Sequence, residues 1–181
     1  AVGAARAAFD SGPWPRLAPS ERAAVMLRIA DEIEARATEL SHTNTLENGS
    51  PVSETTGASI NAAGIFRYFA SLAPLLESED VRPFPNGPGE SLVRRDPVGV
   101  CGLIAPWNFP INLSFSGLIA AFAAGNRSMV KMSENSRHLA KLLIEKSPKY
   151  FPRDKLAFFD ETGGVGIEFS KLKFDHILFT G

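Results

Sequence analysis

An alternation of short apolar segments and helical segments in the second half of the chain constrains the fold more than any other feature. Strands that are buried on both faces read as continuous apolar runs, whereas amphipathic helices repeat their apolar residues every three or four positions. Apolar runs of strand length cover residues 98–105, 128–132, 155–159 and 174–179. Helical patterns lie between them, at residues 113–124, 136–150 and 163–172. This order predicts an α/β fold with a doubly wound, Rossmann-like parallel sheet and right-handed crossovers.

The first half of the chain predicts two helices that pack as a hairpin before the sheet. The first is a long amphipathic helix with Ser20 as its expected N-cap, and it closes near Gly49. The second runs from about Ser53 to Leu76, and Pro74 weakens its last turn because proline cannot donate a backbone hydrogen bond.

A connector between the two halves is expected at residues 82–90, which contain three prolines and two glycines. That composition disfavours both a helix and a central strand. Residues 91–95 are expected to form an edge strand after it. We therefore predict an amino-terminal helical segment and connector at residues 1–90, and part of an α/β domain at residues 91–181.

Composition and charge exclude several classes of function. A chain of 181 residues that is 44% hydrophobic can bury one substantial core. The net charge is −1 with acids and bases interspersed, so no nucleic acid and no anionic membrane is expected as a partner. No apolar run is long enough to span a bilayer or to form a signal peptide, and we expect a cytoplasmic protein. One cysteine and three scattered histidines predict neither an internal disulfide nor a metal site.

Polar residues follow the first two predicted strands. Asn108 lies in a turn after the first strand, and Lys131 and Glu134 follow the second. Open α/β sheets bind ligands at the carboxyl ends of their strands, so the pattern suggests a nucleotide beside a reaction centre. The amide of Asn108 is able to stabilise negative charge on a carbonyl oxygen, or alternatively to cap the next helix. Lys131 and Glu134 suit a ribose diol, or alternatively form a solvated turn with a charge pair.

These segments resemble the aldehyde dehydrogenase superfamily. The sequence P-W-N-F-P at residues 106–110 matches the family's P-W-N-[FY]-P turn, and K-M-S-E at residues 131–134 is similar to its K-P-S-E turn, with methionine in place of proline. Residues 174–181 look like the strand that leads into the family's F-T-G-S block. The sequences of residues 119–127 and 174–176 are similar to those of the class 3-like branch of the family, which includes coniferyl aldehyde dehydrogenases.

The resemblance implies NAD(P)-dependent oxidation of a small-molecule aldehyde, in this branch an aromatic one such as coniferyl aldehyde, to a carboxylic acid. NAD is the expected cofactor and NADP the alternative, because a carboxylate beside the ribose 2′-hydroxyl repels a 2′-phosphate. By the same resemblance Asn108 serves in the oxyanion hole. The residues implied to bind the cofactor are Ile104, Pro106, Trp107, Lys131, Glu134 and Gly166. Trp107 is equally well interpreted as a packing anchor.

The glycine-rich segment after the third strand departs from the family pattern. Family members carry V-x-x-G there, whereas this chain has F-F-D-E at residues 158–161, which puts local phosphate contacts in question. Gly163 and Gly164 are weaker candidates for a phosphate contact than Gly166. A G-x-G-x-x-G sequence is also missing from the first strand–helix turn, as it is in the family.

The sequence does not offer a nucleophile of its own. Cys101 lies inside an apolar strand without a nearby histidine, so we expect a small core residue. The resemblance implies that the nucleophilic cysteine and the general-base glutamate lie beyond Gly181. We therefore expect an incomplete domain of a larger enzyme that is a homodimer or homotetramer at full length, and no turnover by residues 1–181 alone. The alternative is a truncated, non-catalytic module that binds a nucleotide or another protein.

Overall fold

A four-stranded parallel sheet forms the centre of the molecule. The computed structural model describes residues 1–76 and 79–181. The strands lie in the order β5-β4-β3-β6, and all four were predicted from their apolar runs. Their bounds are Val100–Ile104 for β3, Arg127–Lys131 for β4, Leu156–Phe159 for β5 and His176–Phe179 for β6. The predicted parallel α/β sheet is therefore confirmed.

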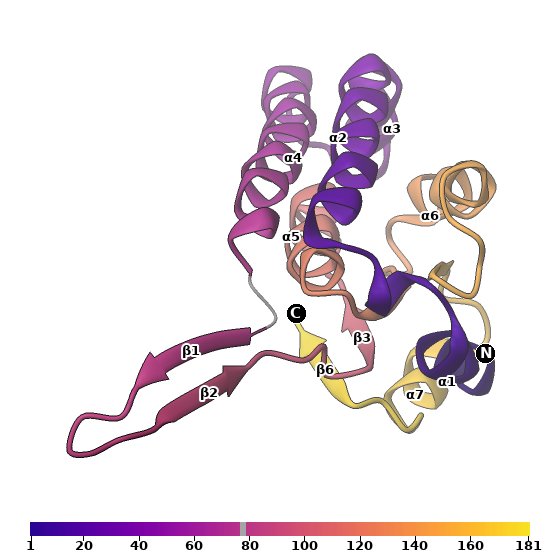
Figure 1. Cartoon of the computed structure of the whole chain (residues 1–181). Helices are drawn as coiled ribbons and strands as arrows, with labels where there is room; N and C mark the ends of the chain where they lie inside the picture. Colours follow the sequence, from indigo (N-terminus) through magenta and orange to yellow (C-terminus); the bar gives the residue numbers. More distant parts are fainter. Residues whose placement is uncertain (77–78) are drawn as a thin grey trace.

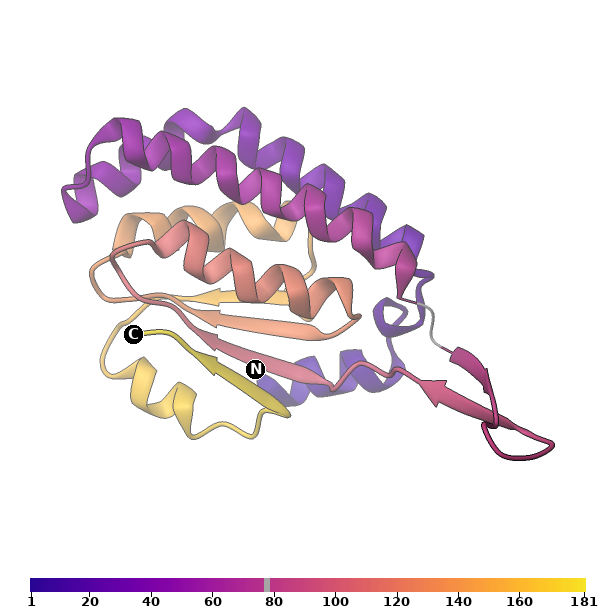
Figure 2. The same cartoon turned by 90° about the vertical axis from the view of Figure 1, so that its left-hand side faces the viewer.

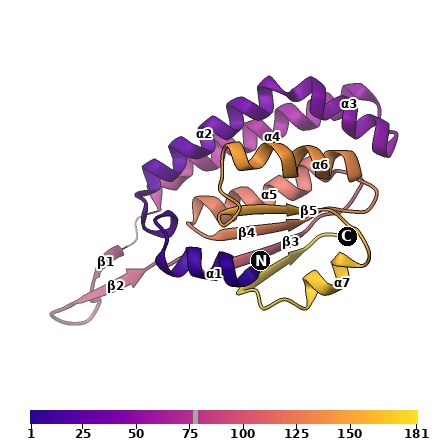
Figure 3. The same ribbon diagram turned by 90° about the vertical axis from the view of Figure 1, so that its right-hand side faces the viewer.

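Helices cover both faces of this sheet (Figures 2 and 3). Helices α5 (Pro110–Ala123) and α6 (Arg137–Lys146) lie on one face, and α1 (Val2–Ser11) and α7 (Val165–Ser170) lie on the other. The chain moves outward from β3 through β4 to β5, and then returns across the opposite face to place β6 on the other side of β3. The strand order therefore reverses between β3 and β6, which is the topological switch point of a doubly wound sheet.

A further helical layer packs over α5 and α6, as Figure 1 shows. It consists of α2 (Pro19–Ala35), α3 (Ala37–Asn48) and α4 (Val52–Leu72). Short 3₁₀ turns flank the layer and follow α6, at η1 (Trp14–Arg16), η2 (Ala73–Leu75) and η3 (Ser147–Lys149). The predicted helical hairpin is present, and Pro74 falls in η2 directly after α4, where the sequence predicted a weakened turn.

Two details of the predicted first helix are wrong. The helix begins at Pro19 with Ala18 as N-cap rather than at Ser20, because proline at the first helical position already has the required φ angle. The helix also breaks at Arg36, whose φ and ψ are −107° and 12°. Buried residues continue at helical spacing from Ile33 to Leu40 across the break, so periodicity alone does not reveal it. The predicted end is correct, since Gly49 closes α3 with a φ of 76°.

A β-hairpin projects from the body between α4 and the sheet (Figure 1). Strand β1 (Glu79–Pro83) pairs with β2 (Glu90–Arg94) in an antiparallel, two-stranded sheet. The predicted edge strand is therefore wrong in its partner: it joins β1 and not the main sheet. Pro83 is tolerated because a two-stranded ribbon leaves one side of each strand unpaired.

The predicted connector, residues 82–90, contains the end of β1, the turn of the hairpin and the first residue of β2. The predicted boundary at residues 90–91 falls within β2, and the division into two domains stays a prediction. Arg94 forms an exposed ion pair with Asp96, at 3.0 Å between Nε and Oδ1. A role of this segment at an interface between copies, in a homodimer or homotetramer, also stays a prediction.

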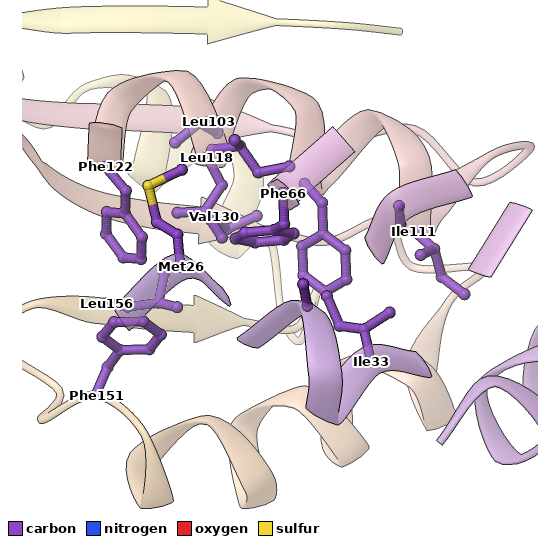
Figure 4. Close-up of a cluster of buried hydrophobic side chains, with 14 of the residues drawn as sticks. Met26, Ile33, Phe66, Leu103, Ile111, Leu118, Phe122, Val130, Phe151 and Leu156 are labelled. Atoms are coloured by element: carbon purple, nitrogen blue, oxygen red, sulfur yellow. The ribbon is translucent and has the colours of Figure 1, made fainter. Parts of the chain in front are cut away.

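One hydrophobic core joins the helical layer to the sheet (Figure 4). Met26 of α2 and Phe66 of α4 pack in the same cluster as Leu118 of α5 and Val130 of β4, and all four are at most 1% exposed. Both halves of the chain therefore contribute to the same buried surface, and the helical layer supports the sheet from which the polar residues project.

Two kinds of feature are not found within residues 1–76 and 79–181. None of the helices there is long and apolar enough to cross a membrane. No group of three or more histidine, cysteine, aspartate or glutamate side chains in those ranges is placed to hold a metal ion.

Candidate functional site

The carboxyl ends of the four strands lie in one row. In the register of the sheet Lys131 lies between Phe159 and Ile104, and Ile104 lies beside Phe179. The backbone N–H of Ala105 donates to the carbonyl of Lys131 at 3.0 Å, which continues this pairing into the turn. The polar residues that sequence analysis placed on separate turns therefore lie at the same edge of the sheet, and this edge includes the switch point. We call Ile104, residues 106–108, Lys131 and Glu134 the strand-end site.

Asn108 lies in the turn between β3 and α5, with its side chain exposed. The N-cap of α5 is Phe109, and no side chain caps this helix. The interpretation of Asn108 as a helix cap is therefore wrong. Its backbone carbonyl accepts a hydrogen bond from Nδ2 of Asn48 at 3.1 Å. The turn is thus held through the main chain of Asn108, and its side-chain amide makes no hydrogen bond to the described residues.

Asn48 and Glu47, at the end of α3, connect the helical layer to this edge of the sheet. The Glu47 carboxylate accepts the backbone N–H groups of His138 and of Leu139, the latter at 3.1 Å, in the first turn of α6. Sequence analysis assigned no role to these two residues. Their acid and amide functions were visible, but their partners lie 60 to 92 positions away along the chain.

The apolar members of the site differ in exposure. Trp107 is 50% exposed, so it does not anchor the core. Pro106 is partly exposed in the same turn, and Ile104 packs against the small cluster beneath the sheet that includes Phe169. The predicted contacts of these three residues with a nicotinamide stay predictions.

Lys131 is buried and is held by a partner that sequence analysis did not assign. Its Nζ atom lies 2.7 Å from Oε2 of Glu161, and the Glu161 side chain is only 17% exposed. The same Glu161 oxygen accepts the backbone N–H of Gly166 at 2.8 Å. The hydrogen bond from Lys131 is the main cause that lowers the pKa of Glu161 below its usual value, against the opposing effect of burial.

Glu134 lies apart from this ion pair. It is exposed and accepts a hydrogen bond from Oγ of Ser133 at 3.3 Å. A Lys131–Glu134 charge pair, which was one interpretation of this turn, is therefore wrong, because Lys131 is paired with Glu161. The predicted joint role of Lys131 and Glu134 at a ribose stays a prediction.

Gly166 packs directly against the ion pair. A Cβ atom at this position would lie 2.7 Å from Oε2 of Glu161 and 3.1 Å from Nζ of Lys131, so a larger residue would push the pair apart. Gly163 and Gly164 have φ angles of 64° and 83°, and a Cβ built on either meets no atom within 4 Å. A larger residue at position 166 would thus displace the ends of the Glu161 and Lys131 side chains, whereas Gly163 and Gly164 provide a left-handed turn that opens to solvent.

Cys101 is not a nucleophile in this structure. It lies in β3, is 4% exposed, and burial raises the pKa of its thiol to about 11. A thiol with that pKa is protonated at neutral pH, and thiolate is the reactive form. The expectation of a small core residue is confirmed.

Comparison with known proteins agrees with the geometry. The sequence profile of the aldehyde dehydrogenase family matches residues 1–181. Geranial dehydrogenase from Castellaniella defragrans is 43% identical over 137 residues, which cover 75% of this chain and 28% of that protein. A probable coniferyl aldehyde dehydrogenase from Pseudomonas aeruginosa is 47% identical over 94 residues, which cover 52% of this chain and 20% of that protein.

A solved structure shares the fold. The aldehyde dehydrogenase of Mycobacterium tuberculosis, crystallised in complex with NAD⁺, superposes with a TM-score of 0.88 at 30% identity, over 98% of this chain and 37% of that protein. The chain spans about a third of the length of such relatives. The resemblance to aldehyde dehydrogenases that was inferred from the strand-end motifs, including the similarity to coniferyl aldehyde dehydrogenases, is confirmed. Because the family profile matches every residue from 1 to 181, the chain belongs to the aldehyde dehydrogenase family.

Proposed function

We propose that residues 1–181 form the amino-terminal, cofactor-binding part of an NAD-dependent aldehyde dehydrogenase that oxidises an aldehyde to a carboxylic acid. The observation that carries this proposal is the side-chain amide of Asn108, which is exposed at the carboxyl end of β3 beside the switch point of the sheet and makes no hydrogen bond within residues 1–76 and 79–181. Family membership and relatives crystallised with NAD⁺ support the assignment of the reaction and the cofactor.

The donors and acceptors of the strand-end site fit the ribose of NAD. The ammonium group of Lys131 carries three hydrogens and directs one to Glu161, which leaves others for hydroxyl oxygens. The exposed carboxylate of Glu134 is free to accept a hydroxyl hydrogen. When bound, NAD would supply the hydride acceptor for the reaction. The role of this chain is to position the nucleotide and to stabilise charge beside it.

Asn108 is proposed to act on the aldehyde oxygen. As a nucleophile attacks the carbonyl carbon, negative charge develops on this oxygen, and a neutral amide N–H stabilises the charge without a proton transfer. The bond from Asn48 restrains the backbone of Asn108, and Pro110 starts α5 directly after the turn. Such restraint keeps the donor oriented before the reaction begins, which is the condition for effective electrostatic stabilisation.

Binding of NAD to this chain is directly measurable. The chain has two tryptophans, of which Trp14 is 1% exposed and Trp107 lies in the strand-end site. NAD should quench the emission of Trp107 saturably, with a Kd below about 1 mM. Replacing Trp107 with phenylalanine should remove the quenching while calorimetry still detects binding. Absence of saturable NAD binding by calorimetry to the unaltered chain would contradict the proposed function.

An apolar, conjugated aldehyde is the proposed substrate class. The relatives named for geranial and coniferyl aldehyde share 43% and 47% identity with the matched parts of this chain, against 38% for a betaine aldehyde dehydrogenase. We expect the complete enzyme to show a kcat/KM for coniferyl aldehyde at least about tenfold above that for the cationic betaine aldehyde, since one apolar pocket contact contributes 1–3 kcal/mol. A preference for betaine aldehyde in steady-state assays would reject this substrate class.

A further inference from the structure

Three polar groups meet at the carboxyl ends of β4 and β5, where one of them, Lys131, belongs to the strand-end site. These are the Nζ atom of Lys131, the Oε2 atom of Glu161 and the backbone N–H of Gly166, with the carboxylate oxygen 2.7 Å from the first and 2.8 Å from the last. Lys131 is the last residue of β4, and Glu161 lies two positions after the end of β5. The ion pair therefore bridges the ends of two adjacent strands and is set by the parallel register of the sheet.

The Lys131–Glu161 ion pair is enclosed, in contrast to the Lys171–Glu168 ion pair on α7. The side chains of Lys131 and Glu161 are 9% and 17% exposed, whereas those of Lys171 and Glu168 on α7 are 63% and 74% exposed. Exposed pairs contribute little, but the removal of one partner from an enclosed pair leaves a charge with few water molecules to solvate it. Glu161 therefore holds the ammonium group of Lys131 in an ion pair and neutralises its positive charge.

This neutralisation has a consequence for the ligand. A ribose hydroxyl needs only a hydrogen-bond donor or acceptor, and the remaining ammonium hydrogens of Lys131 still provide donors. A phosphate ester carries nearly two negative charges and needs a net positive charge nearby. An ammonium group whose charge is cancelled by an adjacent carboxylate does not supply that net charge, and the carboxylate itself repels phosphate.

We infer that Glu161 is a specificity-determining residue that makes the strand-end site select NAD over NADP by holding Lys131 in a neutral ion pair. The inference rests on the proposed function, since it assumes that the adenosine ribose lies at the end of β4. It differs from the expected repulsion by Glu134, because Glu134 is exposed and forms no ion pair with Lys131 among the described residues. The acidic sequence at residues 158–161, which departs from the family's V-x-x-G, thus has a role in the choice between NAD and NADP.

Calorimetric titration with NAD and with NADP tests the inference. The unaltered chain should bind NAD at least about tenfold more tightly than NADP. Glu161→Gln, which keeps the size of the side chain and an oxygen for both hydrogen bonds, should tighten NADP binding roughly tenfold and change NAD binding by less than about threefold. Glu161→Asp keeps the negative charge and should retain the preference for NAD.

The matched control is Glu168→Gln on α7, which removes the same charge from an exposed ion pair and should leave both affinities unchanged. If the unaltered chain binds NAD and NADP equally, or if Glu161→Gln leaves their ratio unchanged, the inference is overturned while the proposed function stands. The comparison of the two nucleotides on the unaltered chain needs no variant, so equal affinities overturn the inference even if a variant fails to fold. Glu161→Gln separates the effect of Glu161 from the repulsion expected of Glu134. If neither nucleotide binds the unaltered chain, the proposed function itself fails.

Discussion

Replacing Asn108 with alanine should lower kcat of the complete enzyme by two to three orders of magnitude. Removal of one donor from an oxyanion hole typically costs about 3–4 kcal/mol of transition-state stabilisation, because no water molecule takes its place in the same orientation. The amide of Asn108 makes no hydrogen bond to the described residues and does not cap α5, so its loss should not unfold the turn. Steady-state kinetics with a fixed aldehyde measure the effect on kcat.

Two further variants separate a catalytic role from a structural one. Asn108→Asp keeps the shape of the side chain but brings a negative charge towards the developing oxyanion, so its loss of kcat should be at least as large. Asn61→Ala removes the same amide from an exposed position on α4 and should leave kcat within about twofold. NAD affinity of Asn108→Ala should stay within about threefold of the unaltered enzyme. A kcat that falls by less than about fivefold in Asn108→Ala would contradict an oxyanion role.

Replacing Trp14 with alanine should lower the free energy of unfolding by about 3–5 kcal/mol. Trp14 is 1% exposed, and its ring packs edge-on against Phe122 of α5 and Phe151, with ring centroids 5.5 and 6.3 Å away. The substitution removes this aromatic cluster and leaves a cavity between η1 and α5, which the surrounding helices fill only in part. Urea unfolding followed by far-ultraviolet circular dichroism measures the change.

Two further substitutions serve as comparisons for the predicted effect of Trp14→Ala. Trp14→Phe should cost less than half as much, because the indole N–H of Trp14 has no partner among the described residues and its removal offsets part of the lost packing. Phe84→Ala removes an aromatic ring that is 54% exposed at the tip of the hairpin, and should change the stability of the monomer by no more than about 0.5 kcal/mol. A loss below 1 kcal/mol for Trp14→Ala would show that η1 does not anchor the helical layer.

The elements of the main sheet were predictable because their signals are local. A buried parallel strand needs only a short apolar run, and β3 is a clear example, with every residue from Val100 to Leu103 buried. The turn that carries Asn108 was equally visible, since two prolines flank it and α5 begins at the second. The hairpin was predicted only in half, because β1 consists largely of charged and exposed residues and is defined by its pairing with β2.

The candidate site was likewise predictable only in part. The positions of Asn108 and Lys131 at strand ends followed from the order of strands and from family-like motifs. The partner of Lys131 did not: Glu134, three positions away, was the nearer carboxylate along the chain, yet the ammonium group is bound by Glu161, thirty positions away. Glu161 was recognised only as a departure from the family pattern, with no contact assigned.

The amino-acid sequence by itself determined the order and type of the strands of the main sheet and of α5, α6 and α7, and which polar residues follow the strands, because periodicity and proline punctuation act within a few residues. Helix α1, which covers one face of the sheet, was not predicted. The tertiary structure alone decided that Lys131 is neutralised by Glu161, that Asn48 restrains the Asn108 turn and that Glu47 caps α6. Each of these contacts joins segments that only the register of parallel strands and the packing of the helical layer bring together, and no local pattern encodes that distance.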